Sequence, residues 1–250
     1  MSNSTHERPA ASGTGGFSTT RWTMVATARD LNSPAAAAAW EELARRYWQP
    51  VFVYLRSRGI ALHDAQDLTQ DFFARIITHD YLSAAAPEKG RFRTFLRVAA
   101  ARFALNDRDR RHAAKRGGGV AAVSLDAVDD TGRPLAEPID EASAELLYER
   151  RWALTILERA LARLRAEYDE SGRAAEFAAL KDQLTASRAE ANHAETAARL
   201  GTTEGAARVA LHRLRKRLRA HFRAEVADTL ADESELESEL RHVIGLLSQG

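Results

Sequence analysis

Apolar side chains recur at intervals of three and four residues along most of the chain, which is the spacing of one face of an α-helix. The alternation typical of a half-buried strand is almost missing, and Ala, Leu, Arg and Glu, which favour helices, dominate. The pattern therefore predicts an all-α protein. We expect helices at about 21–30, 36–58, 62–78, 90–114, 142–168, 173–187, 193–200 and 204–227, with a weaker one near 233–247.

A stretch of Gly, Pro and Asp interrupts the helical pattern between residues 115 and 140. It reads "KRGGGVAAVSLDAVDDTGRPLAEPID", and its glycine triplet and two prolines cannot sustain a helix. We therefore expect two helical domains joined by a flexible linker. The predicted divisions are a disordered lead at 1–16, a domain at 17–116, the linker at 117–140, a domain at 141–227 and an acidic tail at 228–250.

Charge is separated into blocks, although the formal net charge of the chain is only +1. Residues 108–116 and 208–223 are rich in Arg and Lys, whereas residues 228–239 are acidic. Opposite blocks in a nearly neutral chain indicate contacts with a polyanion at defined places.

Several functional classes are excluded by what the sequence lacks. With no cysteine there is no disulfide framework, no thiolate nucleophile and no Cys-based zinc site. No apolar run approaches the ~20 residues that span a bilayer, and the first sixteen residues lack the apolar stretch of a signal peptide. We therefore expect a cytoplasmic protein without membrane insertion.

Residues 193–222, "HAETAARLGTTEGAARVALHRLRKRLRAHF", predict two helices separated by a tight turn. Gly201 suits the left-handed conformation that ends a helix, Thr203 can cap the next one, and Glu204 is favoured at its positive end. A short helix followed by a basic helix fits a helix-turn-helix whose second helix enters the major groove of DNA. An Arg-rich helix that only faces solvent is the alternative.

The stretch "DAQDLTQDFFARII", residues 64–77, places Asp64, Asp67 and Asp71 on one face of a helix. Mg²⁺ is commonly held by one or two carboxylates and substrate phosphates, so the spacing alone permits a metal site. Such a site needs further acids or a phosphate-binding pocket on a facing helix, and the nearby segments offer arginines and aromatics instead. We therefore predict no metal, no cofactor and no catalysis, and favour a basic partner.

The segment that follows, 90–114, interleaves Phe92, Phe95 and Phe103 with arginines. Single-stranded nucleic acid is bound by this combination, because arginines contact phosphates and rings stack on unpaired bases. The spacing of Phe95 and Phe103 favours a core role for these two rings, and the loop from Tyr81 to Phe92 stays open between the two roles.

Taken in order, these features resemble a bacterial RNA polymerase sigma factor of the sigma-70 superfamily, in its compact extracytoplasmic-function (ECF) group. The resemblance rests on "DAQDLTQDFF", "GRFRTFLRVAAARFALNDRDRR" and "AETAARLGTTEGAARVALHRLRKRLR", and covers about 17–116 and 141–227. It implies a subunit that binds core RNA polymerase and directs promoter recognition and DNA opening in transcription initiation. The alternative is a helix-turn-helix transcriptional regulator that dimerises through its N-terminal helices and is not a polymerase subunit.

The resemblance also implies three sets of site residues. The polymerase-binding set, which docks on the clamp helices of the largest subunit, is Asp64, Asp67, Leu68, Gln70 and Asp71. The −10 DNA-binding set is Lys89, Arg91, Phe92, Arg93, Arg97, Asn106, Arg108, Arg110 and Arg111. The −35 DNA-binding set is Thr203, Glu204, Arg208, His212, Arg213 and Lys216. The polymerase flap is a further implied contact, and whether an anti-sigma factor binds is left open.

Two segments exceed the compact pattern of that group. A helical insert at about 141–188 is expected to enlarge the C-terminal core, with an additional partner surface as the alternative. The acidic tail is expected to be a solvated end, and the alternative is a segment folded over the basic helix or the −10 surface.

Overall fold

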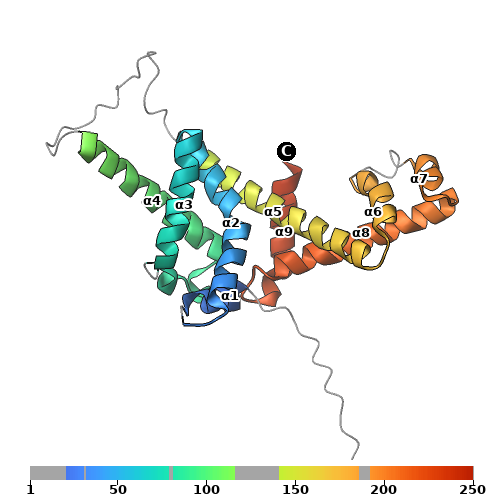
Figure 1. Ribbon diagram of the computed structural model, residues 1–250, viewed down its shortest axis with the longest axis horizontal. Helices are drawn as coiled ribbons and strands as arrows, with labels where there is room; N and C mark the ends of the chain where they lie inside the picture. Colours follow the sequence, from blue (N-terminus) through green and yellow to red (C-terminus); the bar gives the residue numbers. More distant parts are fainter. Residues whose placement is uncertain (1–20, 31, 79–80, 116–140, 186–191, 250) are drawn as a thin grey trace, which may run out of the picture.

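The computed structural model of the chain describes residues 21–30, 32–78, 81–115, 141–185 and 192–249. Within these ranges it contains nine α-helices, four short 3₁₀ helices and no strand (Figure 1). The prediction of an all-α protein is confirmed.

Four helices of the N-terminal half pack together. They are α1 (Arg21–Arg29), α2 (Ala36–Ser57), α3 (Leu62–Thr78) and α4 (Phe92–Lys115). Two 3₁₀ turns, Tyr81–Ala84 and Pro87–Lys89, connect α3 to α4. Gly90 has a positive φ of 111°, which a residue with a side chain rarely adopts, and it separates the second turn from α4.

The C-terminal half contains five helices. They are α5 (Glu141–Glu170), α6 (Ala174–Leu180), α7 (His193–Leu200), α8 (Glu204–Ala227) and α9 (Leu236–Ser248). The expected helix at 173–187 is shorter than predicted, because α6 gives way to a 3₁₀ turn at Lys181–Gln183. The weak prediction near 233–247 corresponds to α9, a well-formed helix.

The first half of α5 packs against the N-terminal helices, and not only against its own half of the chain. Tyr148, Trp152 and Ile156 are buried in one core with residues of α1 to α4. The rings of Tyr54 and Tyr148 lie 6.1 Å apart, and the Tyr148 hydroxyl donates a hydrogen bond to the carbonyl of Arg93 over 2.9 Å. The insert is expected from the sequence to enlarge the C-terminal core; its first half instead packs on the N-terminal helices, because its large side chains at spacing four fit the apolar face of α2.

The second half of α5 supports a smaller core. Leu164 and Tyr168 are buried there together with Leu180 of α6 and with Leu211 and Leu214 of α8. One helix thus runs through both cores (Figure 1). The predicted linker, 117–140, lies outside the described residues. Within the described ranges, the helices on its two sides share the larger core, and the packing shows no division between them.

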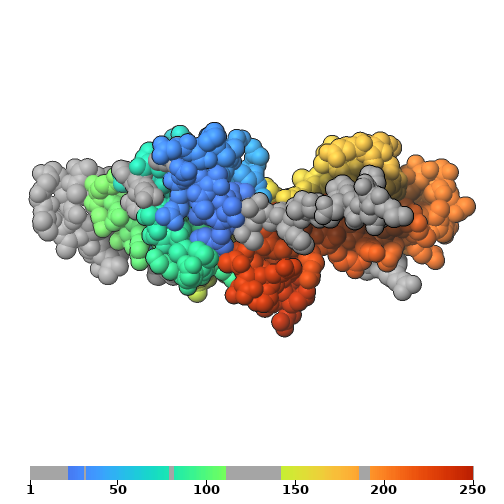
Figure 2. All heavy atoms as spheres, turned by 90° about the horizontal axis from the view of Figure 1, so that it is seen from below, coloured from blue at the N-terminus to red at the C-terminus, as the bar shows by residue number. Residues whose placement is uncertain are grey.

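The acidic C-terminal segment is folded onto the same core. Leu236, Val243 and Leu246 of α9 are buried, and Leu240 and Leu247 pack beside them. Figure 2 shows this segment, in red, against the part of the chain coloured green. The preference for a solvated tail is wrong. The acids of 228–239 dominate the sequence pattern there, but an apolar row that begins at Leu236 continues through α9 and packs on the core.

Trp152 gives a test of the shared core. Its ring is buried and lies under the guanidinium of Arg93, with 4.0 Å from Cζ to the ring centroid. Truncation leaves a large cavity, so we expect Trp152→Ala to lower the free energy of unfolding by about 3–5 kcal/mol, measured by denaturant unfolding. Because both halves share this core, the denaturant concentration at the unfolding midpoint should fall for both halves together in this variant.

The matched control is Leu154→Ala, two residues away on the same helix but 39% exposed. We expect it to change the free energy of unfolding by about 0.5 kcal/mol or less. Equal small losses in both variants would contradict the packing of α5 against α2.

Candidate nucleic-acid interface

The pair α7 and α8 is formed by local signals at each end. The side chain of Asn192 accepts a hydrogen bond from the Glu195 N–H over 3.0 Å and caps α7, a cap that sequence reasoning missed. Gly201 ends α7 with a φ of 61°, in the left-handed region, as predicted. Thr203 Oγ1 then accepts from the Ala206 N–H over 3.3 Å and caps α8, which confirms the predicted cap.

One face of α8 presents polar and basic side chains to solvent. Glu204, Arg208, His212 and Lys216 follow one another at a spacing of four, so they lie in one row, and all are exposed. Arg213 is exposed beside this row. Among the described residues, none of the ion pairs involves Arg208 or Lys216. The row is therefore a basic surface whose charge is available to a partner.

The opposite face of α8 holds it in place. Ala207, Leu211 and Leu214 are buried. Arg215 donates to the Gln183 carbonyl over 2.6 Å, and Arg217 pairs with Glu167 of α5. Arg215 and Arg217 thus have structural partners, whereas Arg208, His212, Arg213 and Lys216 are exposed. In Figure 1 the start of α8 and α7 lie at the end of the molecule opposite α4.

The acidic residues of α3 form an exposed surface. Asp67, Gln70 and Asp71 are exposed, and Asp64 is half-buried. The imidazole of His63 lies 3.1 Å from a carboxylate oxygen of Asp67. Among the described residues, no group of three or more acids or histidines is arranged to hold a metal ion.

Leu68, also in the predicted polymerase-binding set, does not belong to this surface. It is only 3% exposed, because it continues the apolar row of Ala65 and Phe72 into the core. Leu62 at the start of α3 is 58% exposed and Ile77 near its end is 37% exposed, so this helix offers an apolar side chain to a partner at each end. Sequence reasoning missed Leu62, because its exposure follows from its position as the first residue of α3.

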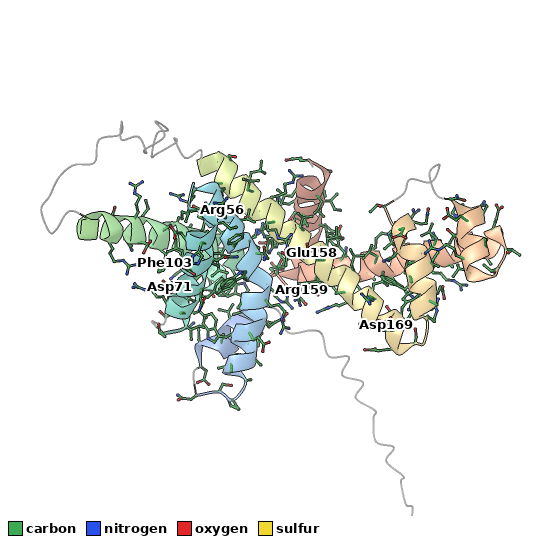
Figure 3. The ribbon with its side chains drawn as sticks, turned by 45° about the horizontal axis from the view of Figure 1, so that its top comes forward. Arg56, Asp71, Phe103, Glu158, Arg159 and Asp169 are labelled. Atoms are coloured by element: carbon green, nitrogen blue, oxygen red, sulfur yellow. The ribbon has the colours of Figure 1, made fainter. Side chains whose placement is uncertain are left out.

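A cavity of about 230 Å³ lies between α3 and α4. Phe95 and Phe103 line it, together with the cationic side chains of Arg75 and Arg102 and the amide of Asn106. The guanidinium of Arg75 lies over the Phe103 ring, with 5.6 Å from Cζ to the centroid. Both rings are half-buried, so they border the core and also face this cavity. Figure 3 labels Phe103 and Asp71 on this side of the molecule.

The end of α4 carries the exposed members of the predicted −10 set. Asn106, Arg108 and Arg110 are exposed, and Arg110 lies 3.3 Å from Asp107. Arg111 continues α4, and its side chain lies outside the described residues. A further exposed member, Lys89, lies in the 3₁₀ turn before α4, and its ammonium donates a hydrogen bond to the Ala84 carbonyl over 3.3 Å.

The start of α4 carries members of the same set that already have partners. Phe92 is buried, with its ring 5.3 Å from that of Tyr47. Arg93 is buried between Glu149, at 2.8 Å, and Glu239. Burial lowers the pKa of the Arg93 guanidinium, and the neighbouring Glu149 carboxylate acts in the opposite direction.

The other two arginines of this region are paired as well. Arg91 pairs with Glu239, and Arg97 lies 2.7 Å from a carboxylate oxygen of Glu145 on α5. In this structure the predicted −10 set is therefore divided. Lys89, Asn106, Arg108 and Arg110 reach solvent, whereas Arg91, Arg93 and Arg97 bind acids of the C-terminal half.

No protein-family model, curated protein or solved structure matched the chain in our comparisons. The helices in the described ranges are too short or too polar to cross a membrane. The functional proposal therefore rests on the motifs of the chain and on these surfaces.

The turn between α7 and α8 gives a second prediction. Gly201→Ala forces a side chain into the left-handed region, so we expect it to lower the free energy of unfolding by about 1–2 kcal/mol. Gly205, in the first turn of α8, has helical backbone, and a methyl group added there would meet only Thr203 Oγ1, at 4.0 Å. Gly205→Ala should raise the same free energy by about 0.4–1 kcal/mol. Equal effects of the two variants in denaturant unfolding would contradict the turn.

Proposed function

We propose that the chain is an RNA polymerase sigma factor of the ECF type, which binds core RNA polymerase and directs promoter recognition and DNA opening. The observation that supports this proposal is the presence of three different surfaces on one helical chain. They are the acidic face of α3, the aromatic and cationic cavity between α3 and α4, and the basic row of α8. Catalysis belongs to the polymerase in this proposal.

The pair α7 and α8 acts as a helix-turn-helix in the proposal. The major groove of DNA admits one α-helix, and the exposed row of Arg208, His212 and Lys216 would face base edges or phosphates there. The buried residues of α8 pack against α5 and α6, and this packing fixes the orientation of the exposed row.

The cavity between α3 and α4 would receive an unpaired base during DNA opening. Its rings, Phe95 and Phe103, can stack on a base, a contact that contributes about 1–3 kcal/mol. Arg75 and Arg102 can contact the adjacent phosphates, and the amide of Asn106 can hydrogen-bond to a base edge. The exposed arginines at the end of α4 extend the cationic surface for the strand.

The acidic face of α3 would bind the polymerase. Carboxylates repel DNA, so a row of them beside a DNA-binding surface fits a basic protein partner. Leu62 supplies an exposed apolar contact at the start of the same helix. The proposed partner surface is formed by the clamp helices of the largest polymerase subunit.

Asp67→Arg tests this assignment. Its side chain is 61% exposed, so the substitution should not disturb the fold. We expect at least a tenfold loss of affinity for purified core RNA polymerase, because charge repulsion replaces attraction, while binding of duplex DNA through α8 is unchanged. Affinity is measured by fluorescence anisotropy of the labelled chain.

Asp169→Arg is the matched control, with the same charge change at the exposed end of α5 (Figure 3). It should bind core polymerase like the unsubstituted chain. An unsubstituted chain that binds no core polymerase, but binds duplex DNA tightly as a dimer, would favour the transcriptional regulator instead.

A further inference from the structure

A single carboxylate of the C-terminal helix binds two arginines at the start of α4. Glu239 on α9 pairs with both Arg91 and Arg93. Glu149 of α5 binds Arg93 over 2.8 Å, and Glu235 lies 3.6 Å from Arg91. Residues 146 and 148 positions apart in sequence therefore meet in one ion-pair cluster.

The centre of the cluster is removed from solvent, whereas the Arg91 side chain is 32% exposed. The Glu239 side chain is fully buried and that of Arg93 is 6% exposed. A buried carboxylate without its partner is strongly unfavourable, so Glu239 holds α9 on α4 as long as both arginines are in place. The apolar row of α9, which includes Leu236 and Val243, covers the same site.

The chemistry of the two arginines is that of a phosphate site. The planar guanidinium group matches the geometry of the two oxygens of a carboxylate and of a phosphodiester. Two guanidinium groups that converge on one pair of anionic oxygens can therefore bind either group. Arg91 and Arg93 also belong to the segment whose motif implies contact with the −10 DNA strand. Glu239 thus occupies a position that a DNA phosphate could take, while Glu149 would stay 2.8 Å from Arg93.

Release of α9 would remove Leu236, Val243 and Leu246 from the larger core, while the contacts among α1 to α5 would stay. A short connection, residues 228–235, joins α9 to the end of α8, and α9 contacts mainly α5 and α8. Its outer side is charged, and its Glu237 pairs with Arg223 of α8 over 2.5 Å near the surface. Besides the buried acid, α9 is held by the Glu237–Arg223 pair, by His242 at 3.4 Å from Glu149, and by five apolar side chains, three of them buried.

We infer that α9 is an intramolecular gate on the −10 surface, in which Glu239 occupies Arg91 and Arg93 in place of a DNA phosphate. The inference rests on the proposed function. Tight binding of the opened −10 strand then requires Glu239 to leave the two arginines, and anything that stabilises the docked α9 reduces promoter opening.

Glu239→Gln tests the gate, because it preserves the size of the side chain and removes its charge. The probe is a single-stranded oligonucleotide with the non-template −10 sequence of a promoter that the holoenzyme transcribes. We expect the holoenzyme that contains Glu239→Gln to bind it roughly 5–150-fold more tightly, the range of an ordinary coupling between two sites. Glu233→Gln, in the exposed connection before α9 and outside the ion pairs of the described residues, should leave the affinity unchanged.

A reversible crosslink tests the gate without touching the cluster. The chain has no cysteine, so Arg223→Cys with Glu237→Cys creates one reactive pair between α8 and α9. A short bifunctional thiol reagent should lower oligonucleotide binding by the holoenzyme by at least the same factor, and reduction should restore it. Binding to core polymerase should not change.

The outcomes separate the gate from the proposed function. Unchanged oligonucleotide binding in Glu239→Gln and in the crosslinked holoenzyme would overturn the gate and leave the sigma-factor proposal intact. Weaker binding in Glu239→Gln together with normal binding in the crosslinked form would also overturn the gate, since the cluster would then only maintain the fold. Failure of every variant and of the unsubstituted chain to bind core polymerase would overturn both.

Discussion

The packing of α5 against α2 is the contact on which the rest of the arrangement depends. Through Tyr148, Trp152 and Ile156 this helix completes the core of the N-terminal half, and through Leu164 and Tyr168 it supports α8. At the crossing, Arg159 lies 2.5 Å from Glu42 of α2 and 3.0 Å from Glu225 of α8 (Figure 3). Burial alone raises the pKa of the Glu42 carboxyl, but the Arg46 and Arg159 guanidiniums outweigh it and lower the pKa overall. The basic row of α8 and the cavity beside α4 are thus held by one continuous helix.

Two buried acids of the C-terminal half form ion pairs with arginines of the N-terminal half. Glu225 and Glu239 are fully buried; Glu225 lies 3.7 Å from Arg46 of α2, and Glu239 pairs with Arg93 of α4. Replacing a buried ion pair by apolar packing of the same volume often costs no stability, whereas removing one partner leaves an uncompensated buried charge and is strongly destabilising. In the proposed function, this pairing determines which arginines of α4 are available to DNA and which are occupied within the chain.

Sequence reasoning predicted the parts of the fold that depend on neighbouring residues. The helices α2, α3 and α8 lie within about two residues of their predicted bounds, because their apolar spacing is regular, and Gly201 and Thr203 supply local stop and start signals. A folded acidic segment is expected from the sequence only as the alternative to a solvated tail, since acids precede and interrupt the apolar row of α9. Glu239, the shared partner of Arg91 and Arg93, lies 148 and 146 residues away from them, and no local pattern specifies such a pairing. The burial of Leu68 and the exposure of Leu62 likewise depend on the helix that covers each one.

The central claim is that this chain gives core RNA polymerase its promoter specificity. In vitro transcription with purified core polymerase and a library of genomic promoter fragments tests it most directly. The account predicts transcripts that start at a fixed distance from a shared two-part motif, and Arg208→Ala should reduce dependence on the upstream part by about 1–3 kcal/mol if that side chain contacts a base. Transcription no higher than that of core polymerase alone, from every fragment, would contradict it.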